Sequence, residues 1–403
     1  MDELEYTLGT TILGNHPITL DVHERRQHLA IFGKSGTGKT TLMLGMMQTD
    51  ILARCGFIFI DPHGDTARSL ANSVPKHLTR DVIFFKPADP DYAVSWNPIK
   101  QTEPFYRWTV AANITEILRT IWKDSWGPRL DHIMTQGVNL LLQKTGTTLA
   151  DLPQVFTDKV FRTSLLDKCD DTKIVRYWKH RYDKLTDKVR DETLSPVDNK
   201  IGQFVSNPLL RDVIGHPSTI DIDTIMHRNQ TLIVDLSGMG TEPSRILGAL
   251  IVSAVWQAAQ RRDSIPIGQR TDFGLYVDEF TRYATPTIDN ILSEARKYRL
   301  ALILASQYLS QAEKDVAQGI LGNVGTLIAF RVGSYDSYTL AKELDTKERI
   351  ILDLPNYQAI VKTMRGTTPS APTLITTVLP TTSTGSLGAI IKNTRASYAR
   401  SRA

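Results

Sequence analysis

The stretch GKSGTGKT, residues 33–40, fits the phosphate-loop pattern of a glycine, four residues, then Gly-Lys and Ser or Thr. The context that this motif requires is present, because an apolar strand is predicted at 29–32 and a helix-period run of Leu and Met follows the loop. Its glycines let successive backbone N–H groups face a phosphate, and the helix adds the positive end of its dipole. The sequence therefore predicts a site for ATP or GTP. The residues expected to bind the nucleotide are Gly33, Lys34, Ser35, Gly36, Thr37, Gly38, Lys39, Thr40 and Thr41.

Four side chains are candidates for the chemistry at this site. Lys39 would reach the β- and γ-phosphates, and the hydroxyl of Thr40 would ligate Mg²⁺. An apolar strand at 274–277 ends in two acids, of which Asp278 would hold the Mg²⁺ shell through water and Glu279 would polarise the attacking water. A glutamate next to the metal-binding aspartate favours hydrolysis over simple nucleotide binding.

Composition limits the class of protein. The chain has 403 residues, 41% of them hydrophobic and 22% charged, which is typical of a globular protein with a large core. Its two cysteines rule out a disulfide framework or a zinc site and favour a reducing compartment. We find no signal peptide, and the longest apolar run is too short to cross a bilayer. We therefore expect a cytoplasmic protein without a membrane span of its own, either free or recruited to the inner face of the membrane.

Alternating strand and helix patterns predict an α/β fold with a mainly parallel sheet. From residue 100 to 228 the pattern changes to helices with polar linkers, which predicts an all-α insertion between two strands of the core. The expected organisation is a first core part at 1–99, the inserted domain at 100–228, a second core part at 229–380 and a basic flexible tail at 381–403.

Two further polar residues follow core strands, where functional groups of a parallel sheet gather. Asp61, after the strand at 56–60, would either orient water or metal near the phosphates or cap the next helix. Gln307, after the strand at 300–305, could hydrogen-bond both water and the γ-phosphate and so sense hydrolysis; the alternative is a surface amide.

Basic residues leave two interpretations open. The helical insertion combines tryptophans with many Lys and Arg residues, which suits nucleic acid, but interleaved acids also fit a solvated helix face. From residue 354 onward the chain contains no Asp or Glu. This acid-free end suits contact with a phosphate backbone or a merely solubilising tail. The net charge of +4 does not decide between them.

Several motifs together identify a family. They are DPHGD at 61–65, YVDEF at 276–280 and SEARKY at 293–298. With the phosphate loop, they resemble the HerA/FtsK/VirD4 class of DNA-pumping ATPases, and within it the conjugative coupling proteins of type IV secretion (TraD/TraG/VirD4-like). The resemblance implies a RecA-like core with an all-α insertion, ATP and Mg²⁺ as ligands, and a hexameric ring that threads DNA. It also implies a relaxase or other secretion components as partners.

The resemblance further suggests an arginine finger, delivered across a subunit boundary. Arg296 lies shortly before Gln307, as the finger precedes the sensor in similar proteins, while Arg299 and Arg331 are fallback candidates. A structural salt bridge is the alternative role for Arg296. Coupling proteins usually carry N-terminal membrane helices, and this sequence shows none. Two other functions therefore stay open: a HerA-type motor working with a nuclease in DNA-end processing, and a nucleotide-gated DNA-binding scaffold with little turnover.

Overall fold

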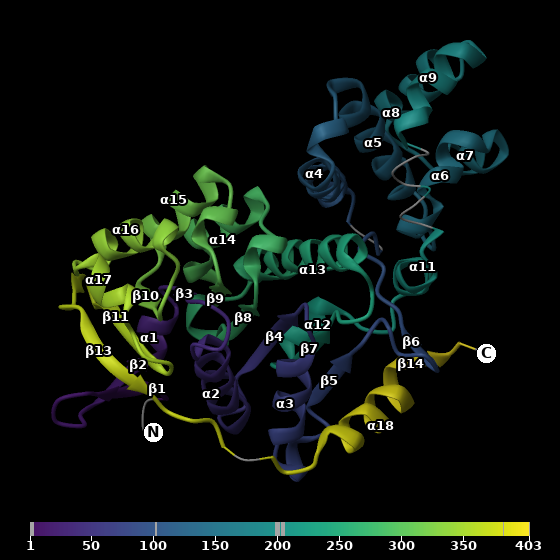
Figure 1. Cartoon of the computed structure of the whole chain (residues 1–403). Coiled ribbons are helices and arrows are strands. Elements are labelled where there is room, and N and C mark those ends of the chain that lie inside the picture. Colours follow the sequence, from purple (N-terminus) through teal and green to yellow (C-terminus); the bar gives the residue numbers. More distant parts are fainter. Residues whose placement is uncertain (1–3, 101–102, 198–201, 203–205, 382, 403) are drawn as a thin grey trace. The chain divides into compact units, whose positions relative to one another are not determined.

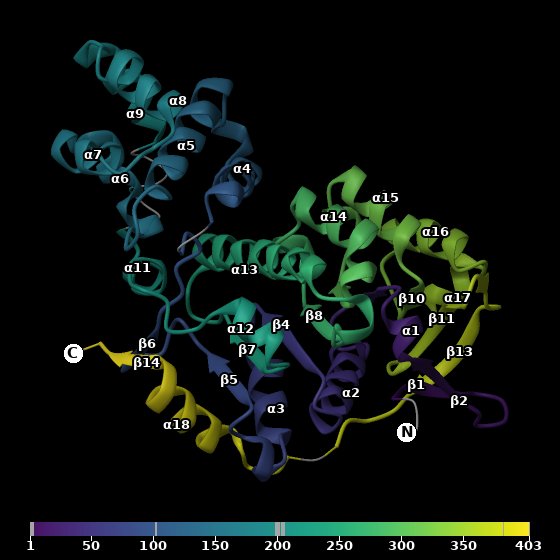
Figure 2. The ribbon, with the colours of Figure 1, turned by 180° about the vertical axis from the view of Figure 1, so that it is seen from behind.

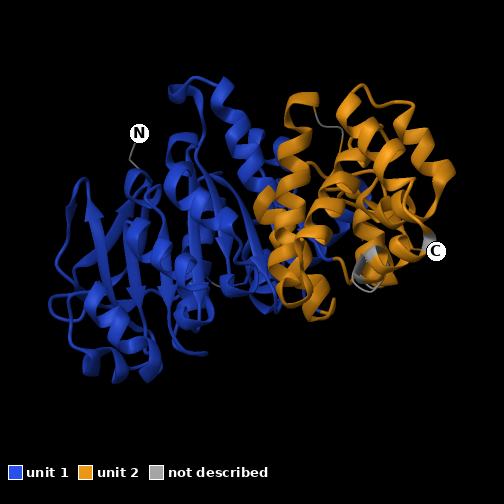
Figure 3. Cartoon of the chain, turned by 90° about the horizontal axis from the view of Figure 1, so that it is seen from above, with its two compact units in different colours: residues 1–86, 222–237, 254–397 blue, residues 87–221, 238–253, 398–403 orange. Residues whose placement is uncertain are grey.

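The computed structural model describes residues 4–100, 103–197, 202, 206–381 and 383–402. The chain forms two compact units (Figure 3). The first, here called the core unit, comprises residues 1–86, 222–237 and 254–397. The second, the helical unit, comprises residues 87–221, 238–253 and 398–403. Because each unit is discontinuous in sequence, each brings together segments that lie far apart along the chain.

The core unit is built on one large sheet (Figure 1). Among the described residues, twelve strands join it, in the order β2-β1-β13-β11-β10-β3-β9-β8-β4-β7-β5, with β12 paired to β11. The strands are β1 (Glu5–Thr11), β2 (Pro17–Asp21), β3 (Leu29–Phe32), β4 (Gly56–Asp61), β5 (Val82–Phe85), β7 (Thr231–Asp235), β8 (Phe273–Val277), β9 (Leu300–Ser306), β10 (Thr326–Ala329), β11 (Gln358–Arg365), β12 (Thr368–Pro369) and β13 (Thr373–Thr377).

Pairing divides this sheet into two parts. From β10 through β3, β9, β8, β4 and β7 to β5, all neighbours run parallel. On the other side of β10, the strands β11, β13, β1 and β2 pair antiparallel. The expected α/β fold with a mainly parallel sheet is confirmed. The carboxyl ends of the parallel strands meet at one edge, where the functional side chains gather.

Helices cover both faces of the sheet (Figures 1 and 2). On one face, α2 (Lys39–Leu52), α3 (Asp65–Ser73) and α18 (Leu387–Tyr398) share an apolar core with the strands. The other face carries α14 (Pro286–Glu294) and α15 (Lys314–Asn323). Met43 and Met47 of α2 are buried one turn apart, as expected for an amphipathic helix. The core unit also contains α1 (Val22–Arg25), α12 (Ile222–His227), α16 (Ser334–Glu343) and α17 (Glu348–Leu352). The long helix α13 (Thr241–Arg261) begins in the helical unit and ends in the core unit.

A buried ion pair joins α2 to α1, and two tyrosines link it to the sheet. Arg25 donates to the Asp50 carboxylate over 2.6 Å, and the two side chains are 1% and 0% exposed. The hydroxyls of Tyr6 and Tyr276 donate to the same carboxylate, at 2.7 and 2.6 Å. Tyr276 belongs to β8, the strand that ends in the acidic pair. The network therefore ties the helix that follows the phosphate loop to the strand that presents Asp278 and Glu279.

The helical unit is wider than the predicted insertion, because it begins at residue 87 and takes in residues 238–253 and 398–403. It also contains a small antiparallel sheet of β6 (Tyr92–Val94) and β14 (Ala399–Ser401). Such short strands carry too little pattern to be recognised in the sequence. The helices are α4 (Pro104–Ile121), α5 (Pro128–Leu141), α6 (Leu152–Thr157), α7 (Lys159–Leu166), α8 (Thr172–Tyr177), α9 (Asp187–Val197) and α11 (Pro208–Ile214).

Two of the tryptophans that suggested nucleic-acid contact belong to the core of this unit. Trp178 is fully buried against Phe156 and Tyr182, and Trp122 is 4% exposed. Arg162 pairs with Asp183 over 2.6 Å beside the same aromatic cluster. For these residues the structural interpretation holds, whereas Trp108 is 53% exposed on α4.

The prediction of a flexible tail is wrong for residues 387–401. In the core unit, α18 buries Ile390 completely, and the hydroxyl of Thr394 accepts a hydrogen bond from the backbone N–H of Phe84 (3.0 Å). In the helical unit, β14 pairs with β6. The partners of these segments lie some 300 positions earlier in the chain, so local sequence pattern could not reveal them.

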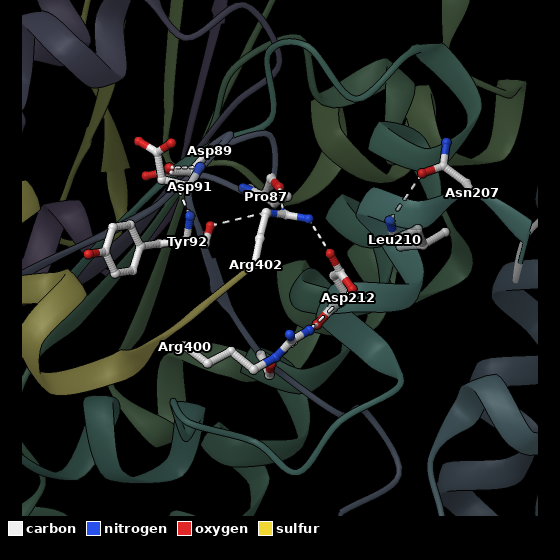
Figure 4. A network of polar contacts seen from close by, with 10 residues as sticks. Pro87, Asp89, Asp91, Tyr92, Asn207, Leu210, Asp212, Arg400 and Arg402 are labelled. Atoms are coloured by element: carbon white, nitrogen blue, oxygen red, sulfur yellow. Dashed lines mark hydrogen bonds and ion pairs between the residues drawn. The ribbon is translucent and has the colours of Figure 1, made fainter.

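Two arginines near the C-terminal end of the chain form hydrogen bonds within the helical unit (Figure 4). Arg400 donates to the Asp212 carboxylate (3.2 Å), and Arg402 donates to the other oxygen of that carboxylate. Arg402 also donates to the carbonyl oxygens of Pro87 (2.6 Å) and Tyr92 (3.3 Å). Because they share the charge of Asp212, these two residues are poor candidates for DNA contact.

The buried ion pair makes a prediction about stability. Asp50→Asn should lower the free energy of unfolding by about 3–5 kcal/mol, because it leaves the Arg25 guanidinium buried without a countercharge. The matched control is Asp353→Asn, which removes a pair with Arg349 whose side chains are 69% and 92% exposed and should cost less than about 1 kcal/mol. Urea unfolding followed by circular dichroism measures both, and equal small losses would contradict the role given to Asp50.

Candidate nucleotide-hydrolysis site

The phosphate loop joins the carboxyl end of β3 to the start of α2. Gly38 has a φ of 121°, and a Cβ placed on it would lie 2.9 Å from the ring of Phe330 and 3.3 Å from Tyr357. A Cβ on Gly33 would come within 2.6 Å of Phe330. Both glycines are therefore needed for the loop to pack closely over Phe330, which is fully buried and follows β10.

Lys39 is folded into this loop. Its side chain is 5% exposed, and its ammonium group donates to the carbonyl oxygen of Lys34 over 3.2 Å. The hydroxyl of Thr37 donates to the same oxygen (2.8 Å). Burial lowers the pKa of Lys39, while the carboxylates of Glu279 and Asp278 act in the opposite direction. The structure thus places Lys39 within electrostatic reach of Asp278 and Glu279.

Asp278 and Glu279 follow directly after β8 and are 6% and 8% exposed. Burial, together with the nearby charges of Asp61 and Glu279, raises the pKa of Asp278 to about 7, against the opposing effect of Lys39. Three carboxyl groups thus gather at the adjacent carboxyl ends of β4 and β8. A bound cation would relieve this repulsion.

Glu279 is held by the end of the neighbouring strand, β9. Its carboxylate accepts hydrogen bonds from the Ser306 hydroxyl (3.3 Å), the Gln307 backbone N–H (3.3 Å) and the Gln307 side-chain amide (2.9 Å). Its φ of 47° is left-handed, which is unusual for a residue other than glycine. The structure therefore brings Gln307 together with Glu279, a contact that the sequence did not suggest. It also assigns Ser306 a part in holding the carboxylate.

Asp61 caps a helix. Its two carboxylate oxygens accept hydrogen bonds from the backbone N–H groups of His63 and Ala67, both at 2.8 Å. Of the two roles considered for Asp61, helix capping is the one that the hydrogen bonds show. Its charge still acts on Asp278, so it shapes the electrostatics of the site.

The three candidate finger residues lie at different edges of the sheet. Arg296 and Arg299 lie at the edge of the sheet where β9 begins, whereas Gln307 lies at the edge where β9 ends, beside the phosphate loop. The seven residues of β9 separate these two edges by about 20 Å. Arg331 follows β10 and lies beside the phosphate loop: its guanidinium donates to the Leu354 carbonyl (3.1 Å) and the Asn356 side chain (2.8 Å). The structure therefore keeps Arg296 and Arg299 away from the phosphate loop of their own chain.

The surroundings of Arg296 are basic. The residues lining a cavity of about 500 Å³ beside it include Arg26, Arg299 and Lys297, and Arg296 itself is exposed. Arg26 is bound to Asp272, and Lys297 donates to Glu294 over 2.8 Å. No ion pair is recorded for Arg296 itself among the described residues, and this leaves its alternative role as a structural salt bridge without support.

The side chains fit Mg²⁺ bound together with a nucleotide. Within the described ranges, no group of three or more His, Cys, Asp or Glu side chains could hold a metal by itself. Mg²⁺ typically takes one or two protein ligands and completes its shell with water and phosphate oxygens. The hydroxyl of Thr40 and the carboxylate of Asp278 offer that kind of partial donor set at the loop.

Family models agree with this geometry. The model described as the central domain of the helicase HerA matches residues 6–255. The chain belongs to the HerA central-domain family. A second model, described as the TraM recognition site of TraD and TraG, matches residues 272–344. No curated protein sequence matches the chain.

Solved structures share the fold. The bacterial conjugative coupling protein TrwBdeltaN70 in its unbound form is similar with a TM-score of 0.65 and 15% identity, over 93% of this chain and 90% of that one. TrwB with an ATP analogue gives a TM-score of 0.63 and 16% identity, over 90% and 87%. VirB4 of Thermoanaerobacter pseudethanolicus gives 0.63 and 13%, over 94% and 97%. The expected membership of the HerA class is confirmed by the family model, and the expected likeness to coupling proteins is confirmed for the fold. Among the described residues, no helix combines the length and the apolar character that a membrane span requires.

Proposed function

We propose that this chain is a DNA translocase driven by ATP hydrolysis, a motor of the coupling-protein type in type IV secretion. The observation that carries the proposal is the buried Glu279 carboxylate, held by three hydrogen bonds near Lys39 and the phosphate loop. A site that only bound nucleotide would gain nothing from such a group. This argues against the alternative of a scaffold with little turnover.

Hydrolysis would use the chain's own residues as follows. The phosphates lie against the loop, and Lys39 exchanges the Lys34 carbonyl for the β- and γ-phosphates. Bound Mg²⁺, with Thr40 and Asp278 as its protein partners, would neutralise charge on those phosphates. Glu279 orients and polarises the attacking water, and Gln307, already on the Glu279 carboxylate, shifts between it and the γ-phosphate. This exchange would let Gln307 report hydrolysis to the rest of the chain.

The position of Arg296 supports assembly as a ring. Since it lies at the sheet edge opposite the phosphate loop, it can serve only a nucleotide bound by another subunit. We propose that it acts as that finger, in a hexamer that threads DNA through its centre. The use of a nucleotide with Mg²⁺ is supported by TrwB, a coupling protein of the same fold that was solved with analogues of ATP and GTP, and with ADP and Mg²⁺.

The matches to family models also suggest which partners this chain binds. The second family model is named for recognition of TraM by TraD and TraG, so we propose that residues 272–344 take part in recruiting a relaxase complex at the cytoplasmic side of a membrane. A second candidate function is a HerA-type motor paired with a nuclease, favoured by the match over residues 6–255. Copurification of a nuclease, and not of secretion components, would select that function.

The roles of Glu279 and Lys39 can be separated. Glu279→Gln should bind ATP normally and lose most hydrolysis, because only water activation is removed, whereas Lys39→Ala should weaken both by removing a direct phosphate contact. Glu313→Gln, which alters an exposed carboxylate at the start of α15, is the control and should turn over at the wild-type rate. Nucleotide affinity and phosphate release give the answer, and full turnover by Glu279→Gln would refute the catalytic assignment.

Arg296 can be tested by mixing subunits. Arg296→Ala alone should bind ATP yet lose about 10³-fold or more in turnover, and mixing it with Lys39→Ala subunits should recover part of the activity. Activity should recover because an Arg296→Ala subunit binds the nucleotide with its intact Lys39, while a neighbouring Lys39→Ala subunit supplies the intact Arg296. Lys297→Ala, which removes an exposed pair with Glu294, is the matched control and should change little. Wild-type turnover in Arg296→Ala would transfer the role to Arg299 or Arg331.

A further inference from the structure

The sheet order places Tyr357 and the catalytic groups on opposite sides of the phosphate loop. Glu279 and Gln307 follow β8 and β9, on one side of β3. Tyr357 directly precedes β11, which lies beyond β10 on the other side of β3. Because β11 runs antiparallel to β10, its first residue lies at the same edge of the sheet as the loop. Tyr357 is therefore a neighbour of the loop, away from the water-activating carboxylate.

The backbone of Tyr357 is fixed from several directions. Its N–H donates to the Thr37 carbonyl oxygen within the phosphate loop (2.7 Å). Its own carbonyl oxygen accepts from the backbone N–H and the hydroxyl of Thr377, at 2.9 and 3.2 Å. Arg331 binds the preceding residues Leu354 and Asn356. The φ of Tyr357 is 64°, a left-handed conformation that costs free energy for a tyrosine and persists only when its surroundings impose it.

The side chain of Tyr357 does not belong to the buried core. The residue is 43% exposed, although its backbone is held by the loop. Its Cδ1 atom would lie 3.3 Å from a Cβ placed on Gly38, so the ring adjoins the loop where α2 begins. A large aromatic ring thus projects from a fixed backbone beside the phosphate site and is partly open to solvent. Packing does not account for this arrangement, but a flat ligand group would.

We infer that Tyr357 is the stacking surface for the base of the bound nucleotide. The inference rests on the proposed nucleotide site. With the γ-phosphate directed toward Glu279 and Gln307, the ribose and base must leave the loop on the β10–β11 side, where the tyrosine ring lies. Stacking uses the π-face that every base presents, so the residue adds affinity for purine nucleotides with little choice between adenine and guanine.

Calorimetric titration with ADP, GDP and pyrophosphate, each with Mg²⁺, tests the inference. Tyr357→Asn removes the ring and keeps a residue that tolerates a left-handed backbone. It should weaken ADP and GDP alike, by about 5-fold to 150-fold, and leave pyrophosphate unchanged, because pyrophosphate has no base. Tyr357→Phe should bind all three normally, since it keeps the ring. Tyr338→Ala, which removes another exposed tyrosine from α16, is the control for general effects.

Two results would overturn the inference. If Tyr357→Asn leaves ADP affinity unchanged, the ring does not touch the base. If it weakens pyrophosphate as much as ADP, the residue acts only by holding the loop through Thr37. Lys39→Ala examines the proposed function separately: it should weaken ADP and pyrophosphate together. An unchanged affinity for both would refute the phosphate-loop site itself, and the stacking surface with it.

Discussion

The crowding of carboxylates beside Lys39 is the constraint on which the rest of the site depends. Burial and the nearby charges of Asp61 and Glu279 together raise the pKa of Asp278 to about 7. Such repulsion is unfavourable unless surrounding structure holds the groups in place. The end of β9 holds Glu279, and the Arg25–Asp50–Tyr276 network fixes β8 to α2. Binding of a nucleotide with its cation would release this repulsion, which gives the site a physical reason to respond to its substrate.

The sheet separates the tasks of the site in space. The carboxyl edge carries the phosphate loop, with the water-activating groups toward β8 and β9 and the tyrosine toward β10 and β11. The amino edge carries Arg296 in a basic cavity. If Arg296 is the finger proposed above, a single chain carries the two halves of a catalytic site on opposite edges of the sheet, and another subunit has to supply the half that completes each site.

Much of this could be predicted from sequence, because the decisive features are local. The phosphate loop, the strand ending in Asp278 and the parallel sheet each follow from patterns of a few residues. The remainder depends on distant contacts. The amide of Gln307 meets Glu279 through strand pairing, and Thr394 of α18 meets β5 across some 300 residues. The basic end of the chain looked flexible because the partner of Arg400 and Arg402 is Asp212, far away in sequence.

The central claim is that this site converts ATP hydrolysis into movement along DNA. Displacement of a third strand from a DNA triplex by the purified chain tests it most directly, because a translocating motor removes that strand without needing to unwind the duplex. We expect displacement that requires ATP and Mg²⁺, fails with a non-hydrolysable analogue and proceeds only when duplex DNA extends beyond the triplex to allow loading. Steady ATP hydrolysis without any displacement on such substrates would contradict the account.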